Sequence, residues 1–498
     1  MERASAIRIH PADTVAVAVR PLAGGETVTA DGERVTLVED VPAGHKLALR
    51  AFEPGESVTK YGFPIGRTTA PVKRGAWVHS HNLRTALDGL IDYRYDPAEL
   101  SPVHPGTMPK FLGYRRANGR VGTRNDVWVL NTVGCVNFAA EAIARGAGDR
   151  FKDVVDGVYA FGHPFGCSQL GDDLRNTQRI LAGLMRHPNA GGVLVLGLGC
   201  ESNQMQQLLA LAGDVDRSRL RFFNTQDVVD EREQGVAAVA ELVERMRSDQ
   251  RVECPASDLL LGHKCGGSDG FSGITANPLV GRIADRLTAL GGGVILTEVP
   301  EMFGAEDVLM NRAASEAVFR DVVAMIDDFK KYFLSHDQPI YENPSPGNIA
   351  GGLTTLEEKS LGAIQKGGRA TVTRVLRYGE PAETGGLSLL ESPGNDGVSS
   401  TAMVASGATI LLFTTGRGTP LGFPVPTIKI SSNSDIARKK PHWIDFDAGP
   451  LLDGAAMMDD LGAALFALIL EVASGVARTN NERNGYREIA IWKEGVTL

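Results

Sequence analysis

The chain is 498 residues long, with a formal net charge of −9 at pH 7 and five cysteines. This length fits about two to four domains. The negative charge argues against nucleic acid or an anionic membrane as a partner, and no apolar run is long enough to span a bilayer. So few cysteines do not make a disulfide scaffold. Because the first residues also lack the pattern of a signal peptide, we expect a cytoplasmic protein with reduced thiols.

Residues 1–93 consist of short β-type stretches separated by proline and glycine. Regularly spaced strands and turns predict a small all-β domain. Near its end, His79 and His81 are two residues apart on a predicted strand, where side chains at this spacing point the same way. The two histidines could therefore share a ligand, or they could be hydrogen-bonded surface residues. Residues 94–112 are rich in proline and predict an extended linker.

Strand and helix patterns alternate from residue 113 onward, which indicates largely parallel sheets covered by helices. We therefore predict an α/β fold behind the small β domain, with a middle domain at residues 113–250 and a last domain at residues 251–498. The expected strands are residues 127–133, 157–161, 192–196, 259–261, 294–297, 410–413 and 427–430, and the expected helices are residues 139–150, 174–187, 231–249, 274–290 and 316–334.

Cysteines follow several of the predicted strands. Strand ends of one parallel sheet lie side by side, so some of these thiols can converge on one edge. Convergent thiolates could hold iron, alone or as an iron–sulfur cluster, although the absence of a Cys-x-x-Cys pair argues against the common zinc and ferredoxin spacings. Alternatively, small cysteines simply pack well at crowded strand ends. The cysteines concerned are Cys135, Cys167, Cys200 and Cys265.

A glycine-rich loop between a strand and a helix surrounds Cys265, at the kind of place where open α/β sheets bind ligands. Ser268 and Asp269 supply side-chain oxygens in this loop. Glu298 and Glu301 close another strand, and carboxylates there suit a divalent ion such as Fe²⁺, Mn²⁺ or Mg²⁺. They could equally cap a helix or form salt bridges. Asp445 and Asp447 are also candidate metal ligands with the same structural alternatives.

Basic residues offer candidates for substrate binding. Arg417 lies between two glycines at a strand end, which suits a clamp for a substrate carboxylate. Lys359 and Lys429 are candidate bases or anion binders, although a lysine on an exposed helix is normally only solvated. Motifs for nucleotide-driven chemistry, serine hydrolysis and hydride transfer are missing. Metal-assisted chemistry on a small acid is therefore the best physical interpretation.

Long motifs then make the chain recognisable. They are residues 114–119 (YRRANG), 132–137 (TVGCVN), 166–173 (GCSQLGDD), 197–201 (GLGCE), 265–270 (CGGSDG), 297–301 (TEVPE), 343–348 (NPSPGN) and 414–420 (TTGRGTP). In this order, and almost from end to end, the chain resembles the altronate/galactarate dehydratase family of sugar-acid hydro-lyases. The resemblance implies a SAF or β-clip domain, a linker, a middle domain that helps to form a homodimer, and a Rossmann-like C-terminal domain with a metal site.

The resemblance also implies dehydration of D-altronate to 2-dehydro-3-deoxy-D-gluconate in hexuronate catabolism, dependent on Fe²⁺, with Mn²⁺ or another divalent cation as a possible substitute. Such a reaction removes the proton α to a carboxylate and expels the β-hydroxyl, so a cation, a base and an acid are needed. We expect the metal on Cys265, Glu298 and Asp445, the substrate on Arg417, Ser268, Asp269, Asn277 and Lys429, the base to be Lys359 and the acid to be His81, beside His79.

Three alternatives remain open from the sequence. The substrate could be another sugar acid such as galactarate. The enzyme could instead be an iron–sulfur hydro-lyase that uses Cys135, Cys167, Cys200 and Cys265. A non-catalytic sensor would bind the sugar acid and produce no keto acid.

Overall fold

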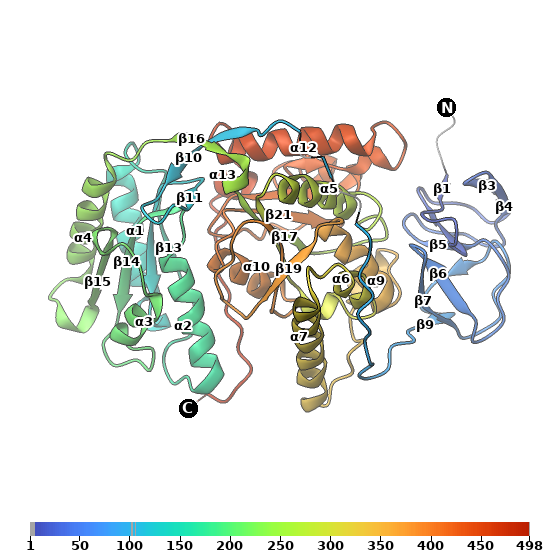
Figure 1. The fold of residues 1–498 in the computed structure, drawn as a ribbon, viewed down its shortest axis with the longest axis horizontal. Coiled ribbons are helices and arrows are strands. Elements are labelled where there is room, and N and C mark those ends of the chain that lie inside the picture. Colours follow the sequence, from blue (N-terminus) through green and yellow to red (C-terminus); the bar gives the residue numbers. More distant parts are fainter. Residues whose placement is uncertain (1–4, 101–102, 105, 498) are drawn as a thin grey trace.

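The structure, a computed structural model, describes residues 5–100, 103–104 and 106–497, so residues 101–102 and 105 of the predicted linker lie outside the described residues. Figure 1 shows a β-rich N-terminal domain on the right, the C-terminal domain in the centre and the middle domain on the left. Within the described residues, none of the helices combines the length and hydropathy needed to cross a membrane.

The N-terminal domain is a small all-β unit, as predicted. Its strands form antiparallel sheets of order β1-β2-β5-β8, β3-β4 and β6-β7-β9. Alternating residues face the core, as in β3, where Val28 and Ala30 are buried between exposed threonines. The strands are β1 (Ala6–Ile7), β2 (Val15–Ala18), β3 (Thr27–Ala30), β4 (Glu33–Thr36), β5 (Lys46–Ala48), β6 (Ser57–Lys60), β7 (Phe63–Thr68), β8 (Trp77–Val78) and β9 (Leu83–Arg84).

The middle domain has a parallel sheet of order β13-β12-β14-β15. Its central strand is buried on both faces: Val127 and Val129 pack with α1 and α4, whereas Trp128 and Leu130 pack with α2. This explains the continuous apolar run in the sequence. The elements are β12 (Asp126–Asn131), α1 (Asn137–Phe151), β13 (Val158–Phe161), α2 (Gly171–Met185), β14 (Ala190–Gly197), α3 (Met205–Ala212), β15 (Leu220–Asn224) and α4 (Glu231–Met246).

The C-terminal domain is built on a seven-stranded parallel sheet of order β19-β20-β18-β17-β21-β22-β23. The chain starts in the middle at β17, runs outward through β18, and later returns to the other side of β17 as β21. The elements are β17 (Leu260–Cys265), α5 (Ala276–Ala289), β18 (Gly293–Leu296), α6 (Glu306–Met310), α7 (Glu316–Ser335), α8 (Pro346–Ala350), α9 (Leu356–Ala363), β19 (Val372–Leu376), β20 (Gly386–Leu390), α10 (Asp396–Ala405), β21 (Ile410–Thr415), β22 (Thr427–Ser431), α11 (Ser434–Lys439), β23 (Phe446–Asp447), α12 (Met458–Ala473) and α13 (Asn480–Asn484).

The domains are joined by a small sheet and by the C-terminal tail. Strands β10 (Lys110–Arg115), β11 (Val121–Gly122) and β16 (Val252–Pro255) pair antiparallel, so residues 110–112 of the predicted linker are in fact a strand. The tail reaches the middle domain, where backbone amides of Glu494 and Gly495 donate to Asp173.

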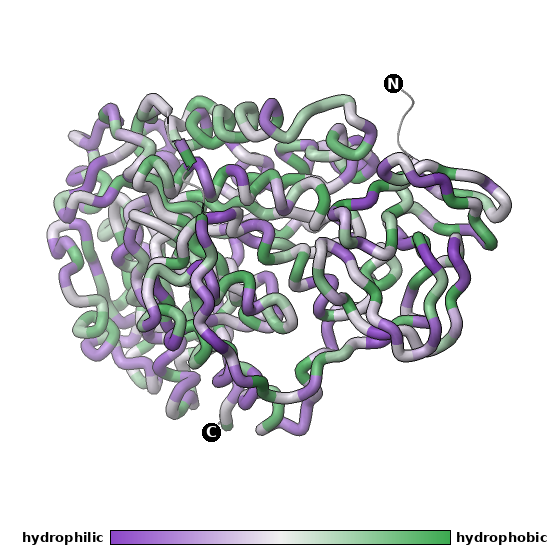
Figure 2. Tube along the Cα trace, turned by 45° about the vertical axis from the view of Figure 1, so that its right-hand side comes forward, coloured by the Kyte–Doolittle hydropathy of each residue, from purple (hydrophilic) through white to green (hydrophobic). Residues whose placement is uncertain are grey.

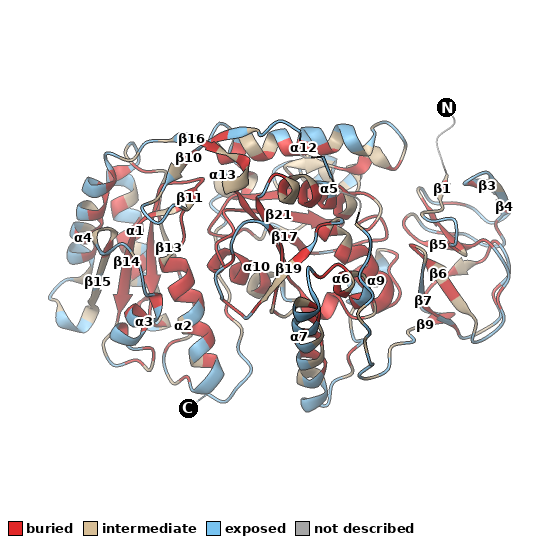
Figure 3. Cartoon of the chain, in the orientation of Figure 1, coloured by how far each residue is buried: buried red, intermediate tan, exposed pale blue. Residues whose placement is uncertain are grey.

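The two α/β domains keep their apolar residues inside. Figure 2 shows hydrophobic segments inside the molecule with hydrophilic segments around them, and Figure 3 shows that both parallel sheets are buried while outer faces of α4 and α12 are exposed. Every residue of α9 is buried, so Lys359 is not a solvated lysine on an exposed helix. Helix α9 lies between the N-terminal domain and the rest of the C-terminal domain. On one side it contacts β7, and on the other it contacts the short helical turn that follows β18.

Candidate active site

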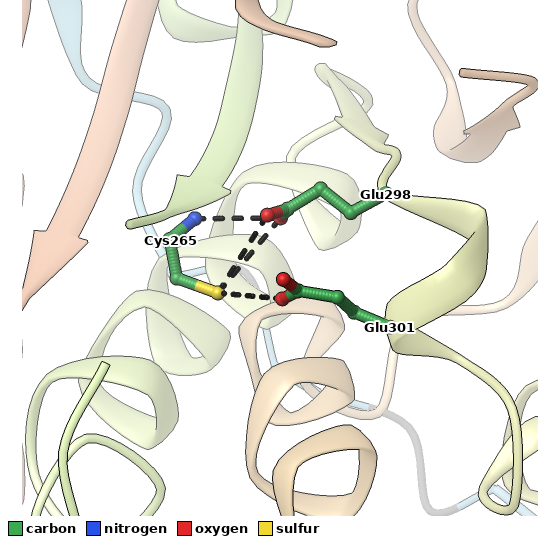
Figure 4. A group of neighbouring side chains, drawn as sticks. All are labelled: Cys265, Glu298 and Glu301. Carbon is green, nitrogen blue, oxygen red and sulfur yellow. Dashed lines mark hydrogen bonds between the residues drawn. The ribbon is translucent and has the colours of Figure 1, made fainter. Parts of the chain in front are cut away.

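The candidate site lies where the C-terminal sheet reverses its strand order. Cys265 ends β17, and Glu298 and Glu301 follow the neighbouring strand β18. Carboxyl ends of strands at such a switch point are where open α/β sheets bind ligands. Glu298 adopts a left-handed backbone conformation with φ of 70°. Figure 4 shows that this brings its side chain and that of Glu301 toward the thiol of Cys265.

Cys265, Glu298 and Glu301 form a compact buried group. The Sγ atom of Cys265 lies 3.4 Å from Oε2 of Glu301 and 3.8 Å from Oε1 of Glu298. One donor atom from each of the three residues falls within 4.8 Å of the others. The group therefore presents one sulfur and two carboxylates at a single point.

Buried lysines surround this group. Nζ of Lys366 lies 2.7 Å from Sγ of Cys265 and 2.7 Å from Oε2 of Glu298. Lys264 contacts the other oxygen of Glu298 and also pairs with Asp396. The two lysines share one face of the site, so burial of the carboxylates is compensated by opposite charge.

Lys359 completes the arrangement from helix α9. Its Nζ lies 2.8 Å from Oε1 of Glu301 and also donates to the side-chain oxygens of Asn343 and Asn348, at 2.8 and 3.1 Å. With Lys264 and Lys366, the site holds three ammonium groups against the carboxylates of Glu298, Glu301 and Asp396. The cluster is therefore neutral when Cys265 is a thiol.

These neighbours shift the protonation equilibria. Burial alone would raise the pKa of Glu301, but the charge of Lys359 and of the other two lysines holds the pKa at about 2. Burial, together with the negative charge of Glu298, raises the pKa of Cys265 to about 12. Burial would lower the pKa of Lys366, but its acidic neighbours, among them the carboxylates of Glu298 and Glu301, raise it overall. Without a metal, Glu301 is thus ionised and Cys265 protonated at neutral pH.

A cavity of about 400 Å³ opens beside the cluster. Its size lies within the range of small-molecule sites. Arg417 lines this cavity with an exposed side chain, and no other described residue bonds to its guanidinium. A free guanidinium can bind a carboxylate through two parallel hydrogen bonds. The lining residues are Cys265, Gly266, Gly267, Ser268, Glu301, Asn343, Ser345, Gly347, Asn348, Lys359, Gly394, Asn395, Asp396 and Arg417.

Two of the predicted substrate residues have structural surroundings instead. Asp269 is buried and accepts hydrogen bonds from Ser272, Ser432 and Asn433, so it holds the loop beneath the cavity. Asn277 accepts from Thr414, and its amide donates to a backbone carbonyl. Neither side chain lines the cavity, which corrects their predicted direct contact with substrate.

Lys429 and Asp445 also lie away from the cavity. Nζ of Lys429 donates to the carbonyl of Thr419 at 2.7 Å. The oxygens of Asp445 accept from the backbone amides of Lys429 and Asn480, each at 2.8 Å. Asp445 belongs to a separate small pocket near α13. The metal-ligand set predicted from sequence therefore needs Glu301 in place of Asp445.

The two histidines of the N-terminal domain differ in burial, although the centroids of both rings lie 5.1 Å from that of Trp77. Strand β8 ends at Val78, and the amides of Asn82 and Leu83 both return to the carbonyl of His79. This turn leaves His79 buried, stacked on Trp77, and His81 exposed. Neither lines the cavity, so the acid role predicted for His81 is not supported by its position.

The other three predicted iron–sulfur ligands belong to the middle domain. Cys135, Cys167 and Cys200 follow β12, β13 and β14, and all are exposed. Cys265 is buried in a different sheet. A single cluster on all four thiols is therefore inconsistent with this fold.

The donor set of Cys265, Glu298 and Glu301 fits a divalent cation in type and spacing. Fe²⁺ and Mn²⁺ accept carboxylate oxygens, and Fe²⁺ also accepts thiolate sulfur. The ammonium of Lys366 contacts both Sγ of Cys265 and Glu298, so these groups already accommodate positive charge in this structure.

Sequence reasoning gave no role to several site residues. Lys264 and Lys366 carry no pattern that distinguishes them from surface lysines, and Asp396 begins a helix that was not predicted. Glu301 had a detectable signal, because it lies three residues after Glu298 at the same strand end.

Comparisons with known proteins agree with this architecture. Residues 4–86 match the model of the altronate/galactarate dehydratase SAF domain, residues 113–247 that of the D-galactarate dehydratase/altronate hydrolase second domain, and residues 256–497 that of the D-galactarate/altronate dehydratase C-terminal domain. A SAF domain in front of a two-part α/β body is thus the class of protein that the fold defines.

Relatives match over the whole length. Altronate dehydratase of Escherichia coli (strain K12) is 51% identical over 99% of both chains. Altronate dehydratase of Bacillus subtilis (strain 168) is 49% identical, over 99% of this chain and 100% of the relative. Galactarate dehydratase (L-threo-forming) of E. coli is 33% identical over 98% of this chain and 96% of the relative. The chain belongs to the altronate/galactarate dehydratase family.

Proposed function

We propose that this protein is a hydro-lyase that dehydrates D-altronate to 2-dehydro-3-deoxy-D-gluconate. The observation that carries the proposal is the full-length similarity, near 50% identity, to two altronate dehydratases, against 33% to a galactarate dehydratase. The cavity beside Cys265 supports it, because charged groups for a sugar acid converge there. Galactarate is the second substrate to test.

The chain's own residues suit the proposed reaction. Arg417 binds the substrate carboxylate at the mouth of the cavity, and Ser268 lies beside it for the hydroxyl groups. Lys359, once it has released its proton to solvent, takes the proton from C2. The C2–H electron pair then forms the C2=C3 bond while the C3–O bond breaks.

Lys359 is also the proton donor in reach of the departing hydroxyl, because neither His79 nor His81 lines the cavity. The proton it took from C2 passes to this group, so that water leaves. The enol that remains tautomerises to the 2-keto acid. Asn343 and Asn348 hold the Lys359 Nζ in position throughout.

Cys265, Glu298 and Glu301 are the residues we propose to hold a divalent metal ion, Fe²⁺ or Mn²⁺. When bound, such an ion would stabilise negative charge on the substrate carboxylate. Thiolate and carboxylate together suit ferrous iron better than magnesium. A cytoplasmic homodimer is the location and assembly that we propose with this activity.

A keto-acid assay tests the function. Purified protein is incubated anaerobically with a panel of aldonates and aldarates, with Fe²⁺, Mn²⁺ or Mg²⁺ in turn. We expect keto acid from D-altronate, with less from galactarate. Binding of altronate that raises the melting temperature without any keto acid under any metal would instead identify a sugar-acid sensor.

A further inference from the structure

Three cysteines lie at one edge of the middle domain, away from the proposed active site. Cys135, Cys167 and Cys200 follow β12, β13 and β14, which are adjacent in the parallel sheet. The chain enters this sheet at β12, adds β13 on one side and then crosses to β14 on the other. Its carboxyl edge at this reversal is the ligand-binding position of an open α/β sheet.

The loops that carry these cysteines are locked together. The amide of Gly134 donates to the carbonyl of Phe165 at 2.8 Å, which ties the first loop to the second. Asn203, from the third loop, donates through its backbone to Gly166 at 3.0 Å and through its side chain to Thr132 at 2.9 Å. The three cysteine loops therefore converge.

A glycine precedes each cysteine, and the packing explains why. A Cβ atom on Gly134 would lie 2.7 Å from the carbonyl oxygen of His163, and one on Gly166 would lie 2.1 Å from that of Thr132. At Gly199, with φ of +128°, a Cβ atom would lie 2.7 Å from Gln226. The backbone thus approaches its neighbours closely on one side and leaves each thiol exposed on the other.

Unpaired buried polar atoms supply a second, independent observation. Among the described residues, Oδ1 of Asn131, Nε2 of Gln169 and Oδ1 of Asn203 are buried without a hydrogen-bond partner. All three residues belong to these same strand ends and loops. In addition, the amide of Gln226 donates to Sγ of Cys200 at 3.6 Å. Orphaned buried polar groups are rare in folded proteins and point to a missing ligand or water.

The arrangement of the three thiols favours one kind of ligand over another. These three sulfurs do not gather as tightly as Cys265 and its two glutamates do, because only the latter group falls within 4.8 Å among the described residues. A single tetrahedral ion would draw thiolates together at that range. An iron–sulfur cluster spreads its cysteine ligands over several irons and is tuned by hydrogen bonds to sulfur.

We propose that Cys135, Cys167 and Cys200 bind an iron–sulfur cluster at this edge of the middle domain. Each thiol loses its proton to solvent as its sulfur binds an iron of the cluster. Because the chain supplies three thiolates here, one iron of a four-iron cluster would keep a position open to an oxygen ligand. This site is separate from the Cys265 cavity and does not depend on the function proposed for that cavity.

The test measures iron and acid-labile sulfide in full-length protein purified anaerobically after incubation with ferrous iron, sulfide and a thiol reductant. We expect acid-labile sulfide together with at least as much iron, and a broad visible absorption band. C135S, C167S and C200S should each lose most of the sulfide and the band while keeping the wild-type melting temperature, since these side chains are exposed.

Cys254→Ser is the matched control, because Cys254 is buried in β16 beside Arg115 and outside these loops. It should keep the sulfide and the band. Iron bound without sulfide, bound zinc in place of iron, or a band that survives all three substitutions would overturn the proposal. Iron held at Cys265 would add to the measured iron but bring no acid-labile sulfide, so the sulfide and the band distinguish the two sites.

Discussion

Two buried groups of lysine and glutamate meet at helix α9, and they have different roles. Adjacent residues of this helix take part, since Glu358 faces the N-terminal domain and Lys359 faces the cavity. On the first side, Glu358 binds Lys46 and Lys60. The side chains are of the same types as those around Cys265, so composition alone does not separate structure from chemistry.

The group around Glu358 is closed, and its one carboxylate pairs with two ammonium groups. Its carboxylate lies 2.8 Å from Nζ of Lys46, 2.7 Å from Nζ of Lys60 and 2.6 Å from Oγ1 of Thr354. The three charged side chains are at most 1% exposed. Such a group fixes how the N-terminal domain sits against α9, because every charge would be costly if the partners separated.

The group around Cys265 is also paired in charge, but it opens onto a cavity. It borders a cavity of about 400 Å³, holds a thiol between carboxylates, and faces the free guanidinium of Arg417. Buried ionisable groups beside a cavity are typical of functional sites. The comparison teaches that access to a cavity, with a thiol and a guanidinium beside it, marks the reactive cluster, whereas buried charge itself does not.

Glu298→Gln tests most directly whether the group around Cys265 is the reactive one. An amide keeps the shape but removes a charge that Lys264 and Lys366 both contact. We expect keto-acid formation to fall at least about 1,000-fold, because charge stabilisation by a bound cation is worth several kcal/mol. The amount of bound iron per chain should fall with it. Circular dichroism checks the fold, and a variant that kept both activity and iron would place the metal elsewhere.

Glu358→Gln should instead act on stability. It leaves the ammonium groups of Lys46 and Lys60 buried without an opposite charge. We expect the free energy of unfolding to drop by about 3–5 kcal/mol in urea titration. Glu253→Gln is the control: its pair with Lys110 is exposed, so the change should stay within about 0.5 kcal/mol. If both variants lost the same free energy of unfolding, the buried group would stabilise the fold no more than the exposed ion pair does.

The sequence predicted the framework of this comparison but not its details. Apolar runs and turns placed β17, β18 and β21, and hence Cys265, Glu298 and Arg417, at strand ends. The metal-ligand prediction was wrong for Asp445, whose carboxylate accepts hydrogen bonds from backbone amides. In the sequence, such a carboxylate looks the same as one that faces a cavity. The order of strands in the sheet decides which loops meet, and the local periodicity of apolar residues does not predict this order.

Long-range packing explains what was missed in the cluster itself. Lys366 lies 101 residues from Cys265 along the chain and reaches it through a short turn after α9. Lys359 looked like a solvated helix residue, but the N-terminal domain covers that helix. The histidine prediction failed because β8 ends one residue before His79. In each case tertiary contacts, rather than local pattern, set the role.

Arg417→Ala tests whether the guanidinium beside the cavity binds the substrate carboxylate. Its guanidinium has no partner among the described side chains and lines the cavity. Loss of hydrogen bonds from a charged donor is worth about 1.5–3 kcal/mol, so we expect KM for altronate to rise about tenfold or more, with a smaller change in kcat. Arg438→Ala is the control, since Arg438 is exposed on α11 and pairs with Asp435. An unchanged KM would remove Arg417 from the substrate site.

The smallest expected effect is a change in the free energy of unfolding with pH. Its direction tests whether Glu358 stabilises the closed group through its charge. Burial would raise the pKa of Glu358, but Lys46 and Lys60 hold it well below its ordinary value. Between the folded pKa and the unfolded value of about 4.3, the unfolded state therefore binds more protons, and stability falls as the pH drops. We expect the advantage of the wild type over Glu358→Gln to be complete at pH 5. Below about pH 4 it should shrink by about 1.4 kcal/mol per unit. Urea titrations of both proteins measure this difference, and one that stays constant from pH 5 to pH 3 would mean that Glu358 contributes through shape rather than charge.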